Sequence, residues 1–181
     1  MALLAVLVGV FALPLAARAQ TVNLDDFVLD NQAGSIMIRF SLSVTEPEHL
    51  ERALRNGASL ALRCVARMCR PRGFWFDASV SGAVYENTIT YDALSQEFVL
   101  AVAGSEQQSR DKDLRALLRG AWGAVAMDLG SYELLDRGRD YAVDLDVSLK
   151  FDDVPQWLRS ALFFWNWNAV PTTRYRMEFQ Y

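Results

Sequence analysis

The chain has 181 residues, of which 52% are hydrophobic and 22% are charged, and its formal net charge is -4. This length favours a single domain, and the apolar content is enough for a packed core, which excludes a largely disordered chain. A weakly acidic protein has no overall field that attracts polyanions, so nucleic-acid binding is not expected.

The first segment, MALLAVLVGVFALPLAARAQ, is mostly Ala, Leu and Val, and it carries no charge between residues 2 and 17. Ala17 and Ala19 are small residues at the positions that a signal peptidase reads. We therefore predict a cleavable secretory signal over residues 1–19, a single domain over residues 20–181 and a periplasmic location. The alternative is an uncleaved anchor, although Arg18 interrupts the apolar run before the ~20 residues that a membrane span needs.

Alternation of apolar and polar residues with a period of two, which is typical of half-buried strands, dominates the rest of the chain. The alternation is regular over residues 36–44, 60–69, 74–80, 141–150 and 174–181, and less regular over residues 24–30, 84–91 and 97–103. Most of these segments have one polar face, as antiparallel sheets with one side in water do.

Three segments change to helical spacing. In residues 45–57, Thr45 and Glu48 match a capping box and Gly57 is a stop signal. Residues 111–125 carry an apolar stripe with acidic residues at their start, and a third helix is expected to begin at Asp153. The predicted fold is mainly β: an antiparallel two-sheet sandwich of about eight strands with two or three short helices inserted.

The cysteines Cys64 and Cys69 lie in one predicted strand, where they have opposite parity and are separated by roughly 16 Å. Bridged Cα atoms lie within about 7 Å of each other, which favours two free thiols. A disulfide across a local turn or bulge stays open, because an exported protein meets oxidising conditions.

No catalytic constellation is visible. His49 is the single histidine, and it lies on the first predicted helix, away from both cysteines. Asp144 and Asp146 share one strand face and could bind a cation, or they could simply form the wet face of that strand. We expect no enzyme activity, no metal and no cofactor.

Four arginines, Arg63, Arg67, Arg70 and Arg72, fall close together in the sequence. They could form a patch for anionic head groups or an acidic partner. The alternative is a solvated sheet face whose arginines pair with carboxylates such as Asp77.

The stretch PQWLRSALFFWNWNAVP, residues 155–171, is the densest aromatic segment of the chain. A helix that is apolar around much of its girth must be buried on several sides or must contact lipid or another protein. The segment has one Arg and no Lys, so a membrane-surface helix is not favoured. It could plug one end of the sandwich, or it could be a partner interface formed by Trp157, Phe163, Phe164, Trp165 and Trp167.

With these segments placed, the chain resembles the bacterial family known as domain of unknown function 4390. The resemblance rests on the signal segment, the strand at 36–44, TITYDALSQEFVLAV, the leucine-rich helix at 111–125 and YAVDLDVSLKFDDVPQWLRSALFFW. The family implies no activity and no site residues. Its members are encoded near membrane-bound sensor kinases of the nitrogen-regulation type, which implies a role as a signalling accessory.

Two functions follow as hypotheses. The first is an exported, non-enzymatic periplasmic module that binds a protein partner, such as an envelope protein or the outer part of a membrane sensor. The second is a carrier that holds a lipid or another small apolar ligand between its sheets.

Overall fold

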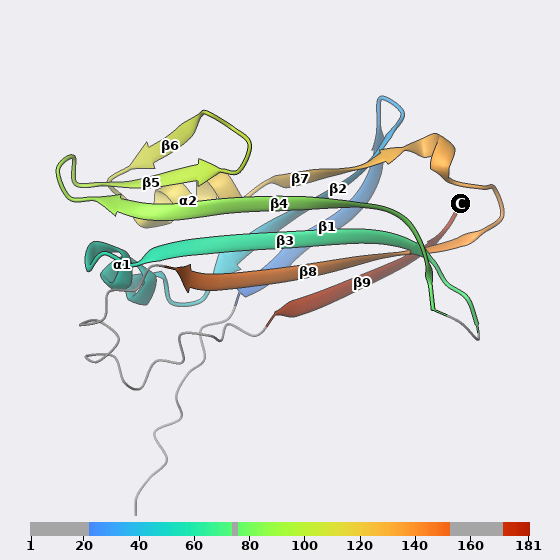
Figure 1. The fold of residues 1–181 in the computed structure, drawn as a ribbon, viewed down its shortest axis with the longest axis horizontal. Helices are drawn as coiled ribbons and strands as arrows, with labels where there is room; N and C mark the ends of the chain where they lie inside the picture. Colours follow the sequence, from blue (N-terminus) through green and yellow to red (C-terminus); the bar gives the residue numbers. More distant parts are fainter. Residues whose placement is uncertain (1–21, 74–75, 153–171) are drawn as a thin grey trace, which may run out of the picture.

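A computed structural model describes residues 22–73, 76–152 and 172–181 of the chain, and every structural statement concerns these residues. In this part of the chain, nine strands form two antiparallel sheets that pack face to face (Figure 1). The smaller sheet has the order β1-β2-β7, with β1 at Val22–Gln32, β2 at Ser35–Val44 and β7 at Val125–Ser131.

The larger sheet has the order β6-β5-β4-β3-β8-β9. Its strands in chain order are β3 (Ser59–Arg70), β4 (Ala78–Asp92), β5 (Glu97–Val102), β6 (Gln108–Asp111), β8 (Asp140–Asp152) and β9 (Thr173–Gln180). Strands β3, β4 and β8 form its long central part, with β9 along one side (Figure 1). The predicted fold class, a mainly β antiparallel sandwich with few helices, is therefore confirmed.

The helices follow their apolar stripes. Helix α1 (Pro47–Arg55) buries Leu50, Ala53 and Leu54, and it ends before Gly57, whose positive φ of 89° suits a residue without a side chain. Helix α2 (Leu114–Trp122) is capped by Asp113, whose side chain accepts a hydrogen bond from the Arg115 N–H. A short 3-10 turn, η1 (Tyr132–Leu134), follows β7.

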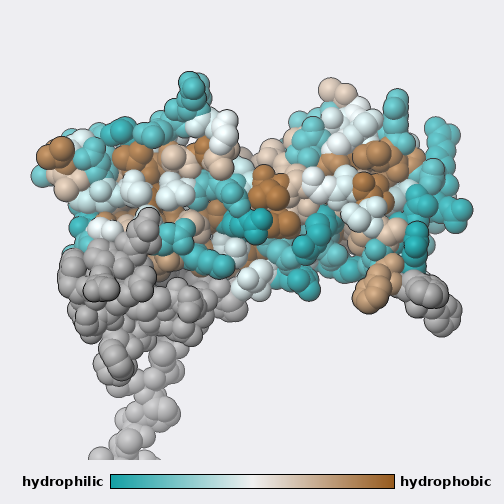
Figure 2. Space-filling view, in the orientation of Figure 1, coloured by the Kyte–Doolittle hydropathy of each residue, from teal (hydrophilic) through white to brown (hydrophobic). Residues whose placement is uncertain are grey.

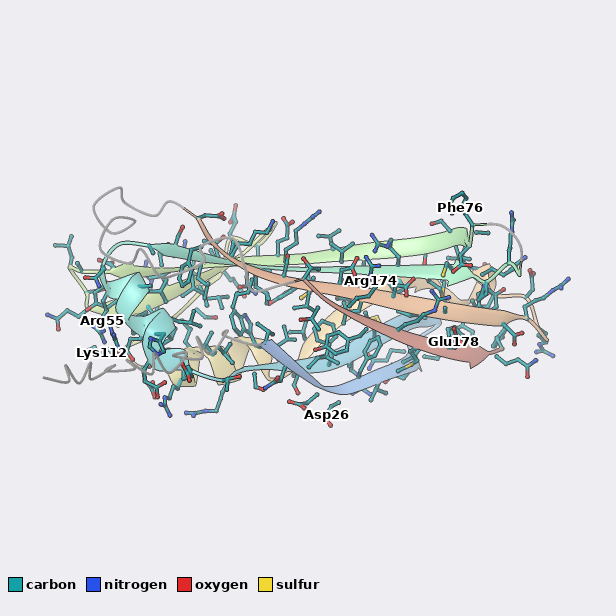
Figure 3. All side chains as sticks on the ribbon, turned by 90° about the horizontal axis from the view of Figure 1, so that it is seen from below. Asp26, Arg55, Phe76, Lys112, Arg174 and Glu178 are labelled. Atoms are coloured by element: carbon teal, nitrogen blue, oxygen red, sulfur yellow. The ribbon has the colours of Figure 1, made fainter. Side chains whose placement is uncertain are left out.

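The core lies between the two sheets, with α2 packed into one end of it (Figure 3). Alternate residues of the long strands supply it, as the period-two pattern predicts, including Ile38 and Phe40 of β2 and Leu62 and Cys64 of β3. Trp122 of α2 is fully buried, and its indole Nε1–H donates to the Asn87 side-chain oxygen at 3.4 Å. Asn87 is itself only 2% exposed, so this bond ties α2 to the larger sheet.

The predicted strands at 74–80 and 84–91 are wrong as separate elements, because β4 runs unbroken from Ala78 to Asp92. Gly82, which lies between them, pairs with Arg67 inside the ladder. Phe76 has the apolar parity of the predicted strand at 74–80, which would point it inward, but it precedes β4 and is 95% exposed. The alternation around Phe76 therefore belongs to a loop.

Two strands were missed. The sequence of β6, QSRD, has no apolar residue, so it carries no alternation signal. The apolar residues of β7 do alternate, but Val125 also continues the helical spacing of α2, which hid the start of the strand. The predicted capping box is wrong too: the N-cap of α1 is Glu46, because Pro47 occupies the first turn. The third predicted helix lies outside the described residues.

Candidate functional site

The outer face of the larger sheet, which points away from the core, carries most of the predicted site residues with a charge: Arg63 and Arg67 on β3, and Asp144 and Asp146 on β8. Arg63 and Arg67 lie on this face of β3, as their shared parity predicts. Arg63 Nε lies 2.5 Å from Glu86 Oε1 of β4, and Arg67 contacts Asp146 of β8. Both guanidinium groups therefore have a carboxylate partner within the chain.

Of the other two members of the predicted arginine patch, Arg70 is the last residue of β3 and Arg72 lies in the loop that follows. Arg70 Nη2 is 2.6 Å from Asp136 Oδ2 and 3.2 Å from the hydroxyl of the buried Tyr141. The Arg72 backbone N–H donates to Asp77 Oδ1 at 3.3 Å, while the residue itself is exposed. Arg63, Arg67 and Arg70 thus each have a carboxylate partner within the chain, and Arg72 lies in the loop beyond them. The binding of an anionic partner by these four arginines stays a prediction.

Asp144 and Asp146 project from the same face of β8, and their nearest charged groups are arginines. Asp146 lies between Arg67 and Arg174, whose Nε is 2.7 Å from Asp146 Oδ1. The hydrogen bond from Arg174 lowers the pKa of Asp146, and Arg67 acts in the same direction. The guanidinium groups of Arg67 and Arg174 therefore supply the positive charge beside Asp146, where the sequence allowed a bound cation.

Arg176 connects three carboxylates on this face. Its guanidinium lies 3.1 Å from Asp77 Oδ2, 3.4 Å from Asp144 Oδ1 and 3.1 Å from Glu178 Oε1. The hydrogen bond from Arg176 is the main cause of the lowered pKa of Asp77. The roles of Arg174 and Arg176 were missed, although the polar faces of the segments at 141–150 and 174–181 were the signal that could have paired them.

The two cysteines of β3 are free thiols on opposite faces of the sheet. Cys64 points into the core, where burial raises the pKa of its thiol to about 12. Cys69 points outward beneath the charged groups, with its Sγ 3.6 Å from Asp77 Oδ2 and 4.0 Å from Asp144 Oδ2. Burial first, and then the negative charges of Asp144 and Asp77, raise the pKa of Cys69 as well. Neither environment favours a reactive thiolate.

His49 lies on α1, where its Nε2 is 3.1 Å from Glu46 Oε2. The His49 side chain is 40% exposed, and this partner lies on the same short segment of chain. Within the described residues, no group of three or more His, Cys, Asp and Glu side chains could hold a metal ion.

Large apolar side chains on the surface lie in separate places in the described part of the chain. Leu94 is 98% exposed in the turn between β4 and β5, and Phe76 is 95% exposed before β4, at the end of the molecule opposite α1 (Figure 3). On the face in Figure 2, hydrophobic residues appear as separate patches among hydrophilic ones. No helix in the described ranges is long and apolar enough to span a membrane.

The predicted aromatic interface, Trp157, Phe163, Phe164, Trp165 and Trp167, lies outside the described residues. The strands on either side of it are described, and they pair directly with each other, since Val147 of β8 lies opposite Thr173 of β9. Beyond this pair, β8 continues to Asp152 alongside β3. The aromatic segment therefore joins two strands that are already neighbours in one sheet.

Comparison with known proteins gives a family and nothing more specific. A family model described as "Domain of unknown function (DUF4390)" matches residues 19–178, which is nearly the whole chain. Neither the search of curated proteins nor that of solved structures found a match.

Proposed function

Since the chain belongs to the DUF4390 family, a domain of unknown function, we propose its role from the geometry: an exported, non-enzymatic module of the cell envelope. It binds a protein partner through the aromatic segment between β8 and β9. The partner is an envelope protein or the outer part of a membrane sensor.

The direct pairing of β8 with β9 is the observation that carries this proposal. Antiparallel neighbours need only a hairpin loop of about 2–5 residues to connect them. Here Asp152 and Thr173 are joined by a much longer segment that holds Trp157, Phe163, Phe164, Trp165 and Trp167. Because the topology does not require this length, a binding role is the simplest reason for so many large apolar side chains.

The chemistry of the outer face supports a role without catalysis. The carboxylates of Asp144 and Asp146 are held by arginines, and both thiols have raised pKa values. The arginine-held carboxylates stabilise the outer face, and neither they nor the two thiols are prepared as a nucleophile or a general base.

The alternative, a carrier of a lipid or another apolar ligand between the sheets, has weaker support. The space between the sheets holds fully buried side chains such as Phe40, Phe98 and Trp122. A ligand in this part of the sandwich would have to displace them.

The proposal is tested by cross-linking the tagged protein in its native envelope and identifying what it captures. We expect Trp165→Ser with Trp167→Ser to lose a specific envelope protein that the unchanged chain captures. The matched control is Phe76→Ser with Leu94→Ser, which removes two exposed apolar side chains elsewhere and should keep the capture. Equal capture by both double variants, or no specific protein at all, would contradict the proposal.

Export is tested separately by sequencing the N-terminus of the protein from the periplasmic fraction. We expect the mature chain to begin at Gln20. A chain that retains residues 1–19 in the cytoplasmic fraction would contradict export, whatever the cross-linking shows.

A further inference from the structure

We propose that β9 is a self-association strand, through which two copies of the chain pair edge to edge and join their larger sheets into one. The starting point is the position of β9, which in the described part of the chain is the last strand of its sheet. Its pairing with β8 has an unbroken register from Val147↔Thr173 to Asp140↔Gln180. Regular edge strands of this kind are templates for pairing with another strand.

The other outer strands of the described sheets, β1, β6 and β7, carry features that oppose such pairing. Strand β7 has a register shift against β2 between Asp128 and Ser131, and Gly130 in this stretch adopts a positive φ of 106°. Strand β6 has only 4 residues. Strand β1 has a register shift between Asp25 and Val28, and Asp26 within it adopts a positive φ of 55°. Short edges and bulges are common protections against edge-to-edge association, and β9 has 8 residues, no proline and no bulge.

The backbone groups of β9 are arranged to accept a partner. The N–H of Tyr181 donates to the Arg139 carbonyl at 3.1 Å, and its carbonyl accepts from the Gly138 N–H at 2.5 Å. Both groups of Tyr181 therefore face the β8 side, and consecutive residues of a strand direct their groups to opposite edges. It follows that Arg174, Arg176, Glu178 and Gln180 present their N–H and carbonyl groups at the outer edge.

The side chains of β9 are complementary to a second copy in one antiparallel register. With Met177 opposite the partner's Met177, Arg176 lies opposite the partner's Glu178, and Tyr175 lies opposite the partner's Phe179. Each of these contacts occurs twice because of the two-fold symmetry. In this register, the four residues whose backbone groups face outward form the hydrogen-bonded pairs, and Met177 occupies a non-hydrogen-bonded pair.

The neighbouring registers are opposed by charge. Side chains on the same face can meet only if the register shifts by whole two-residue steps. One such shift places Arg176 opposite Arg176, and the opposite shift places Glu178 opposite Glu178. Like charges directly opposite each other destabilise a strand pair, so the sequence of β9 selects the register centred on Met177.

The exposure of β9 fits a partner at this edge. The Glu178 side chain is 71% exposed and the Arg174 side chain is 68% exposed, and both residues are labelled on β9 in Figure 3. On the inner face, Tyr175 and Phe179 are only half-buried, although each packs against the core. A second β9 would cover these rings and bring its own Arg176 to Glu178.

The mass of the purified protein in solution, measured across a wide range of concentration, tests the proposal. We expect a dimer, and Glu178→Arg should raise its dissociation constant by about tenfold or more, because both central ion pairs become repulsive. Gln180→Glu should lower the dissociation constant, since it places a carboxylate opposite the partner's Arg174. The matched control is Glu106→Arg, the same charge change in the exposed turn between β5 and β6, which should leave the dimer intact.

Cross-linking tests the register. Met177→Cys should form a disulfide-linked dimer with diamide as the oxidant, because the two positions meet on the symmetry axis. Tyr175→Cys, on the same face, should not, because it lies opposite the partner's Phe179. A monomer at every concentration would overturn the proposal. A dimer that cross-links through position 175, or whose dissociation constant is unchanged by Glu178→Arg, would overturn it as well. None of these outcomes depends on the aromatic segment or its partner.

Discussion

Cys64 and Cys69 show how strongly the position of a side chain on β3 decides its chemistry. Cys64 is fully buried in the core and Cys69 is 7% exposed beneath the charged face, and the pKa of each thiol is raised. Their opposite parity could be read from the sequence, and it agrees with two free thiols. Burial, and then the charges of Asp144 and Asp77, raise the pKa of Cys69. These carboxylates lie on β8 and in the loop before β4, and their approach to Cys69 depends on the strand pairing, which the sequence does not state.

Both thiols should be slow to react in the folded protein. At pH 8, the thiol reagent DTNB should modify neither cysteine at an appreciable rate until denaturant is added, because the reactive species is the thiolate. If the native protein rapidly released one equivalent of thionitrobenzoate from DTNB, this result would contradict the environment assigned to Cys69.

Asp146 is the least exposed of the ion-paired carboxylates in the described part of the chain. Its side chain is 13% exposed between Arg67 and Arg174, whereas Asp136, which pairs with Arg70, is 66% exposed. We expect Asp146→Asn to lower the free energy of unfolding by about 1–2 kcal/mol at neutral pH. Asp136→Asn, the matched control, should cost less than about 0.5 kcal/mol, because exposed pairs contribute little. Denaturant unfolding of both variants measures the difference, and equal effects would contradict the assignment.

The same carboxylate predicts a dependence of stability on pH. The pKa of Asp146 is lower in the folded protein than in the unfolded chain, where it is about 3.9. Its contribution is therefore fully present above that value and is lost as the pH falls through the lower, folded pKa. Asp146→Asn should consequently lose less stability than the unchanged protein on acidification below about pH 4. A parallel loss in both proteins would contradict this contribution.

At the scale of the elements, strands were predictable wherever one face was apolar. The segment at 36–44 became β2 almost without change, and the stripe of Leu50 and Leu54 became the buried face of α1. Strand β6 was not predictable, because its residues gain their conformation by pairing with β5 rather than by burying side chains. The continuity of β4 was hidden by Gly82, which reads as a turn signal in the sequence.

Gly82 has a specific reason to be glycine in β4. A Cβ atom at this position would lie 2.9 Å from the carbonyl oxygen of Ala66 on β3, closer than ordinary contact. Gly82→Ala should therefore destabilise the protein by about 1–3 kcal/mol. Gly120→Ala, in α2, meets open space and should stabilise it by about 0.5–1 kcal/mol. Thermal unfolding of the two variants gives the signs, and a stabilising effect at Gly82 would show that β3 and β4 are further apart.

At the scale of the whole molecule, the two sheets form one interior that the alternation pattern predicted in outline. Residues from both sheets and both helices make a single buried cluster, including Phe40, Leu54, Trp122 and Tyr141. The order of strands could not be predicted, because the sequence patterns of β8 and β9 do not state that these strands are neighbours. Because β8 and β9 pair directly, their connection does not need a segment as long as residues 153–171, and the functional proposal depends on this point.

Replacing the aromatic segment tests this central claim most directly. Strand β8 runs about 17 Å beyond its last pair with β9, so a Gly/Ser linker of about eight residues in place of residues 153–171 can turn and return to Thr173. We predict that this protein folds cooperatively, with the near-ultraviolet signal of the buried Trp122, and that it no longer captures the envelope partner. A chain that fails to fold with the linker would show that these residues complete the core, and would contradict the account.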